Sequence, residues 1–73
     1  MIVRHPPDIF PAYFKLGLAY ERLGQYQEAI VPLEEAIRIK PDYFKSHGLL
    51  GFAYEKLGQY QEAIASYKEV LKI

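Results

Sequence analysis

The chain has 73 residues, no cysteine, no tryptophan, and nine acidic side chains against nine basic ones. This length allows one small domain, which buries only about 60% of the surface of its unfolded chain. Apolar residues make up 51% of the sequence, a fraction too high for a disordered chain. The absence of cysteine excludes disulfide scaffolds, thiolate zinc sites and cysteine nucleophiles.

Charge and hydropathy also narrow the range of partners. The formal net charge is zero, whereas nucleic acids and anionic lipids select basic surfaces, so we expect no nucleic acid partner. No apolar run approaches the roughly 20 residues that span a bilayer, and residues 1–7 do not have the pattern of a signal peptide. We therefore expect no membrane contact, and the sequence indicates no compartment.

The sequence repeats itself after 34 residues. When it is shifted by 34 positions, 19 of the 39 aligned pairs are identical, and the run Leu23–Ile30 returns unchanged as Leu57–Ile64. A match of this length indicates a tandem repeat of one supersecondary unit. We predict an N-terminal extension over 1–8 (the tail of a preceding repeat, or disordered), a first repeat over 9–42, and a second repeat over 43–73 that is truncated and has no capping helix.

The first repeat predicts two helices. Asp8 is expected to cap a helix from about Ile9 to Leu23, since its carboxylate can accept hydrogen bonds from the free N–H groups of a first turn. Pro11 falls in that turn, where its missing N–H costs nothing. Gly24 supplies the left-handed turn that ends the helix, and a second helix follows from about Tyr26 to Lys40.

Pro32 lies about a turn and a half into this second helix. It removes a hydrogen bond and crowds the carbonyl group of Glu28, which costs about 3 kcal/mol in a regular helix. We therefore predict a local bend there.

The second repeat predicts the same arrangement. Pro41 stops the preceding helix, Asp42 caps a helix from about Tyr43 to Leu57, and Gly58 ends it. A last helix runs from about Tyr60 to the end of the sequence. Along the second helix of each repeat, apolar residues recur at helical spacing, which indicates helices with one apolar face.

The two repeats resemble the tetratricopeptide repeat, whose period of 34 residues agrees with the one found here. The residues that carry the pattern are Leu16, Gly17, Tyr20, Ala29, Ala36 and Pro41 in the first copy and Leu50, Gly51, Tyr54 and Ala63 in the second. Tyr13 and His47 stand where the family prefers tryptophan. The resemblance covers about residues 9–73. It implies an all-α fold in which two antiparallel helix-turn-helix repeats form a short right-handed α-solenoid segment.

The small residues of the pattern predict close helix packing. Gly17 and Gly51 lie inside helices, where each costs about 1 kcal/mol relative to alanine. We expect Ala29 and Ala63 to face these glycines, so that the helices of each pair cross closely. The tyrosines and leucines of the pattern are expected to fill the space around each crossing.

In this family the first helix of each unit lines a concave face that commonly binds an extended or helical peptide. The resemblance implies a binding surface here that is apolar at one end and mixed in charge at the other. Its residues are Phe14, Leu18, Glu21, Arg22, Lys45, Leu49, Phe52, Glu55 and Lys56. Phe14 and Phe52 are large for exposed positions; the alternative is that Phe14 packs over Gly48 and Phe52 between helices. The sequence contains no asparagine, so the family's carboxylate clamp is not expected.

The sequence does not indicate an enzyme. Its histidines, His5 and His47, lack a nucleophile beside them and the further ligands of a metal site. We interpret His47 as a packing or hydrogen-bonded residue. No glycine-rich phosphate loop is present, because Gly17 and Gly51 lie in helices and Gly24 and Gly58 in turns. We therefore expect no catalytic residue, no metal and no cofactor.

Two functional hypotheses remain. The first is a non-enzymatic module that binds a protein or peptide partner on its concave face. The alternative is a structural module that associates with itself and has no external ligand. Two units give only four helices, and arrays of this kind usually hold three or more units. We therefore expect a homo-oligomer, a two-fold dimer formed through uncapped ends.

Overall fold

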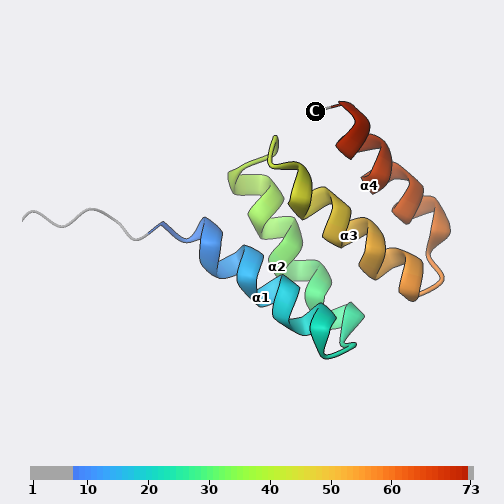
Figure 1. The fold of residues 1–73 in the computed structure, drawn as a ribbon, viewed down its shortest axis with the longest axis horizontal. Helices are drawn as coiled ribbons and strands as arrows, with labels where there is room; N and C mark the ends of the chain where they lie inside the picture. Colours follow the sequence, from blue (N-terminus) through green and yellow to red (C-terminus); the bar gives the residue numbers. More distant parts are fainter. Residues whose placement is uncertain (1–7, 73) are drawn as a thin grey trace, which may run out of the picture.

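A computed structural model describes residues 8–72, which form four α-helices (Figure 1). Their bounds are α1 Phe10–Arg22, α2 Tyr26–Ile39, α3 Phe44–Lys56 and α4 Tyr60–Lys72. Each predicted bound lies within one residue of the observed one, and the prediction of an all-α fold is confirmed. Apart from Asp8, the predicted N-terminal extension over 1–8 lies outside the described residues.

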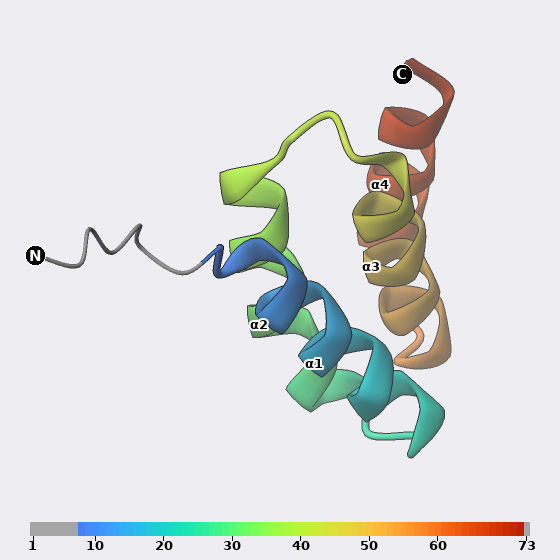
Figure 2. The ribbon, with the colours of Figure 1, turned by 60° about the vertical axis from the view of Figure 1, so that its left-hand side comes forward.

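The helices form two antiparallel pairs, α1 with α2 and α3 with α4 (Figures 1 and 2). The pairs stack through α2 and α3, and α1 also contacts α3. The core lies at this α2–α3 contact, where Ala29, Leu33 and Ala53 are fully buried and Ile30 and Leu50 nearly so. Burying a large aliphatic side chain stabilises a fold by about 1.5–3 kcal/mol, so this interface holds the two repeats together.

The first helix of each pair ends in the predicted glycine turn. Gly24 and Gly58 have φ angles of 75° and 77°, in the left-handed region that glycine tolerates. The N–H of Gln25 donates to the Tyr20 carbonyl at 2.8 Å, and the N–H of Gly24 donates to the Glu21 carbonyl at 2.9 Å. These two bonds make a Schellman motif, which α3 repeats at its own end.

The acidic residues before α1 and α3 have different roles. The N–H of Phe10 donates to Asp8 Oδ1 at 3.2 Å, so Asp8 satisfies a donor at the start of α1, although the N-cap position itself is Ile9 and not Asp8. The prediction that Asp42 caps α3 is wrong, because the N-cap is Tyr43 and no side chain caps it. Residues 40–43 form a turn instead, in which the N–H of Tyr43 donates to the Lys40 carbonyl at 3.2 Å. This turn takes Asp42 out of the capping position.

Gly17 and Gly51 permit close helix packing, but their partners differ from those predicted. A Cβ atom on Gly17 would lie 2.5 Å from Leu33 Cγ, and one on Gly51 would lie 2.8 Å from Tyr67 Cε1. Each glycine therefore makes room for a large side chain of the paired helix. The atoms nearest to the added Cβ belong to Leu33 and Tyr67 and not to Ala29 and Ala63, which we expected to face the glycines, and Ala29 is part of the buried α2–α3 core.

The two pattern leucines are also buried differently. Leu50 lies in the α2–α3 core and is 8% exposed, whereas Leu16 is 44% exposed. Leu50 packs against α2 of the first repeat and not within its own helix pair. The prediction that both leucines fill the crossing within their own pair is therefore wrong. Helix α2 continues through Pro32, which is buried. The bend at Pro32 stays a prediction.

Candidate functional site

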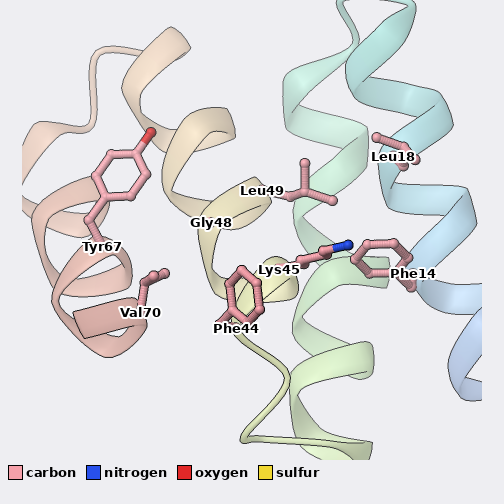
Figure 3. Close-up of a pocket in the computed structure, with 8 residues that line it drawn as sticks. All are labelled: Phe14, Leu18, Phe44, Lys45, Gly48, Leu49, Tyr67 and Val70. Carbon is pink, nitrogen blue, oxygen red and sulfur yellow. The ribbon is translucent and has the colours of Figure 1, made fainter. Parts of the chain in front are cut away.

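An apolar groove of about 560 Å³ runs across α1, α3 and α4 (Figure 3). Its lining residues are Phe14 and Leu18 from α1, Phe44, Lys45, Gly48 and Leu49 from α3, and Tyr67 and Val70 from α4. The volume lies within the range of about 300–1,000 Å³ that is typical of ligand pockets. Lys45 is the only charged residue in this lining.

Gly48 keeps the groove open. It lies on α3 between the α1 residues on one side and the α4 residues on the other (Figure 3). A Cβ atom added to Gly48 would meet no atom within 4 Å, in contrast to Gly17 and Gly51. Packing within the chain therefore does not require a glycine at this position, and its missing side chain leaves space for a ligand.

Phe14 is held in place by an aromatic cluster. Its ring stacks on Phe10 with centroids 6.0 Å apart, and Tyr43 meets both rings edge-on, at 5.2 Å from Phe10 and 5.3 Å from Phe14. Such pairs contribute about 0.5–1.5 kcal/mol each beyond area burial. Phe14 is half-buried, so it packs in this cluster while it also lines the groove. Its observed aromatic neighbours are these two rings rather than Phe52.

The structure brings four of the nine predicted binding residues into the groove: Phe14, Leu18, Lys45 and Leu49. Phe52 lies outside the lining, although it is exposed, and it meets Tyr26 edge-on at 5.8 Å. Lys56 Nζ lies 5.3 Å from the centroid of the Phe52 ring.

The remaining predicted residues also lie outside the lining. Arg22 and Glu55 are exposed but do not line the groove. Four lining residues are not among the nine predicted ones: Phe44, Gly48, Tyr67 and Val70. Phe44 lies one helical turn before Gly48 on α3, so helical spacing could have found it, whereas the α4 residues reach the lining through the packing of α4 against α3.

Glu21 is buried instead of exposed to a partner. It is 7% exposed, and its Oε2 atom has no hydrogen-bond partner among the described residues. Burial raises the pKa of Glu21 to about 7, because a desolvated carboxyl favours its neutral form.

Tyr67 forms one wall of the groove. Its hydroxyl donates to Glu55 Oε1 at 2.9 Å. Burial, this hydrogen bond and the negative charges of Glu55 and Glu21 raise the pKa of Tyr67 to about 12. The hydroxyl therefore stays protonated and can keep donating to Glu55 at neutral pH.

His47 has the structural role that we predicted. It is buried, and its Nε2 atom lies 2.7 Å from the Pro41 carbonyl oxygen, so Nε2 carries the proton and donates it. Within residues 8–72, no three side chains of the metal-binding types gather into one group. In the same range, no helix has both the length and the apolar character needed to cross a bilayer.

Comparison with known proteins identifies the family. A family model described as "TPR repeat" matches residues 22–58, and one described as "Tetratricopeptide repeat" matches residues 44–73. A search of curated proteins gives no match.

Among solved structures, a crystal structure of MamA is 38% identical with a TM-score of 0.82, and it covers 86% of this chain and 37% of its own. A point mutant of MamA is 33% identical with a TM-score of 0.83, and it covers 86% of this chain and 46% of its own. A structure titled MamA AMB-1 is 33% identical with a TM-score of 0.85, and it covers 88% of this chain and 35% of its own. The chain thus spans less than half the length of these structures. The sequence pattern, the stacked helix pairs and these matches together show that the chain belongs to the tetratricopeptide repeat family.

Proposed function

We propose that the chain is a non-enzymatic protein-interaction module whose groove binds a peptide segment of a protein partner. The observation that carries this proposal is the groove itself, with its apolar lining and a single charged residue. Concave apolar surfaces of this kind are the usual sites of ligand binding. Membership of a family that binds proteins supports the same function.

The lining indicates the chemistry of the partner. Phe14, Leu18 and Phe44 offer apolar surface, so the bound segment places large apolar side chains against them. Lys45 extends toward Phe14 at the middle of the groove (Figure 3), where it can pair with one carboxylate of the partner. The apolar contacts supply the affinity, and the charge pair sets orientation and partner choice.

The test begins with peptides selected from a displayed library on the immobilised 73-residue chain. The affinity of a selected synthetic peptide is then measured for the native chain, for Gly48→Leu and for Ala65→Leu. We expect Gly48→Leu to weaken binding at least tenfold, because leucine fills the groove and favours the helix. Ala65→Leu is the matched control, since Ala65 is exposed on α4 outside the groove. Equal affinity for the native chain and Gly48→Leu, with helical circular dichroism retained, would overturn the groove as the binding site.

A charge exchange tests the role of Lys45. If the selected peptide carries an acidic residue that Lys45 recognises, Lys45→Glu should weaken binding about tenfold, which corresponds to about 1.4 kcal/mol. Changing that acidic residue of the peptide to lysine should restore affinity for Lys45→Glu and lower it for the native chain. If the peptide's acidic residue can be replaced without loss, Lys45 does not select the partner.

The alternative function, structural self-association, is favoured by one observation. The apolar residues Tyr60, Ile64 and Leu71 of α4 are 63%, 54% and 86% exposed. Sedimentation over a dilution series separates the two functions. A purely structural module keeps a large size even at the lowest concentrations without any ligand. A peptide-binding module is monomeric at those concentrations and gains mass there when its peptide is added.

A further inference from the structure

We infer that the outer faces of α1 and α4 are the two halves of a head-to-tail contact between copies of this chain. The chain contains a template for this contact, which is its own α2–α3 interface. The α2 half includes Tyr26, Ile30 and Ile37, and the α3 half includes Leu50, Ala53, Tyr54 and Leu57.

The 34-residue repeat places the same two halves on the outer helices. The α2 residues correspond to Tyr60, Ile64 and Leu71 of α4, and the α3 residues correspond to Leu16, Ala19, Tyr20 and Leu23 of α1. Six of these seven pairs are identical, and the seventh exchanges isoleucine for leucine. Leu33 of the same core corresponds to the larger Tyr67 on α4. The other side chains stand on helices of the same register, so the outer faces reproduce most of the shapes that fit each other inside the chain.

Burial shows that most of these outer residues are uncovered within residues 8–72. The exception is Tyr20, which is half-buried and packs against the internal core. Ile30 is 8% exposed in the internal interface, whereas Ile64 is 54% exposed on α4. Leu50 is likewise 8% exposed in the internal interface, whereas Leu16 is 44% exposed on α1. Each copy therefore presents one α1 face and one α4 face, and a second copy carries the complement of each. This continuity with the internal interface identifies the occupant as another copy of the chain.

Two differences make the contact between copies weaker than the internal one. Leu49, which packs against the core at the edge of the internal interface, corresponds to Lys15 on α1. Glu34, whose charge contributes to raising the pKa of Tyr54, corresponds to Lys68 on α4. The exchange of leucine for lysine removes apolar burial, so we expect an association that depends on concentration.

The symmetry of the contact follows from its two unlike halves. An α1 face joins an α4 face, so every addition leaves one face of each kind free, and the assembly grows without closing. This differs from the two-fold dimer that the sequence suggests, in which like surfaces meet. The groove residues Gly48 and Leu49 lie on α3, whereas four other lining residues lie on the helices that carry the outer faces: Phe14, Leu18, Tyr67 and Val70. The effect of the contact on peptide binding is therefore measured separately.

Sedimentation velocity on the native 73-residue chain tests the inference. We expect species of increasing size as the concentration rises, with no single limiting oligomer. Leu16→Glu removes the α1 face and Ile64→Glu removes the α4 face, and each variant alone should be a monomer of about 8.5 kDa. Val31→Glu is the matched control, since Val31 is also exposed but lies on α2, and it should assemble like the native chain. Circular dichroism checks that each variant remains helical.

Mixing the two monomeric variants distinguishes the contact types. The Leu16→Glu chain keeps its α4 face and the Ile64→Glu chain keeps its α1 face, so together they should form a 1:1 dimer that grows no further. A two-fold α4–α4 contact would instead leave Leu16→Glu dimeric on its own, and this result would overturn the inference. A native chain that stays monomeric at every concentration would also overturn it. These faces would then bind helices of a different sequence and not a second copy of this chain. Peptide affinity measured on the mixed dimer shows separately whether the groove functions.

Discussion

The two repeats have nearly the same sequence but different surroundings. In the first repeat, the apolar face of α2 is covered by α3; in the second, the corresponding face of α4 is exposed among the described residues. Ile30 and Ile64 occupy the same position in the repeat, yet only Ile30 is buried. Burial in a repeat array is thus set by the neighbouring unit. The same side chain stabilises the fold in one repeat and is available for contact in the other.

The largest effect that tests this comparison comes from a pair of alanine substitutions. Ile30→Ala should lower the free energy of unfolding by about 2–4 kcal/mol, because it leaves a cavity in the α2–α3 core. Ile64→Ala should lower it by less than about 1 kcal/mol in the monomer, since that side chain is mostly in water. Urea unfolding at a concentration low enough to keep the chain monomeric measures both values. Equal losses would show that the two faces are equally buried in solution.

The helical glycines give the next effect. Gly17→Ala should destabilise the fold by about 1–2 kcal/mol, because its Cβ collides with the fully buried Leu33, and this outweighs the gain in helix propensity. Gly51→Ala should cost less, since Tyr67 is partly exposed and can move outward. Thermal unfolding of both variants gives the comparison. A Gly17→Ala variant as stable as the native chain would contradict the close approach of α1 and α2.

The buried carboxyl of Glu21 predicts a pH dependence. The folded state holds this proton up to a pKa of about 7, whereas the unfolded state releases it near 4.5. The folded state therefore binds more protons in this window, and the contribution of Glu21 to stability, fully present below pH 4.5, is lost as pH rises towards 7. We expect a loss on the order of 1 kcal/mol over this range, measured by urea unfolding.

Two variants test whether Glu21 causes this loss of stability with pH: Glu21→Gln, and Glu55→Gln as its matched control. Glutamine cannot titrate, so Glu21→Gln should remove the loss of stability between pH 4.5 and 7. Glu55→Gln should keep it, because Glu55 is the exposed counterpart of Glu21 in the second repeat. If the native chain and Glu21→Gln change in parallel with pH, Glu21 is not buried in solution.

The smallest effect concerns the glycine in the groove. Gly48→Ala should raise the free energy of unfolding by up to about 1 kcal/mol, since alanine favours the helix and its Cβ meets open space. The result is opposite in sign to that of Gly17→Ala and is measured in the same thermal unfolding series. A loss of stability in Gly48→Ala would show that other residues fill the groove.

The helices could be predicted from local sequence, because the residues that begin or end each helix lie within a few positions of its ends. Gly24 and Gly58 fix the ends of α1 and α3 through backbone conformation alone, so their role can be derived without knowledge of the fold. Asp42 was predicted wrongly because a turn begun by Pro41 competes with capping, and both use the same short segment. The bounds of the helices were still correct to within one residue.

Contacts between helices were predicted less well. The sequence does not show that Leu33, rather than Ala29, lies closest to Gly17, since that depends on how α1 is rotated against α2. The groove illustrates the same limit. Lys45 and Leu49 follow from the repeat pattern, but Tyr67 lines the groove only because of the angle at which α4 crosses α3.

A peptide bound in the groove between α1, α3 and α4 would change the surroundings of the amide groups that line it. Titration of the isotopically labelled chain with a selected peptide, followed by amide chemical shifts, tests it most directly. We predict that the largest shifts occur at groove residues such as Leu18, Gly48 and Leu49, and that Ser66 on another side of α4 stays unchanged. Shifts centred on Ser66 and its neighbours, with the groove signals unmoved, would show that the peptide binds outside the groove.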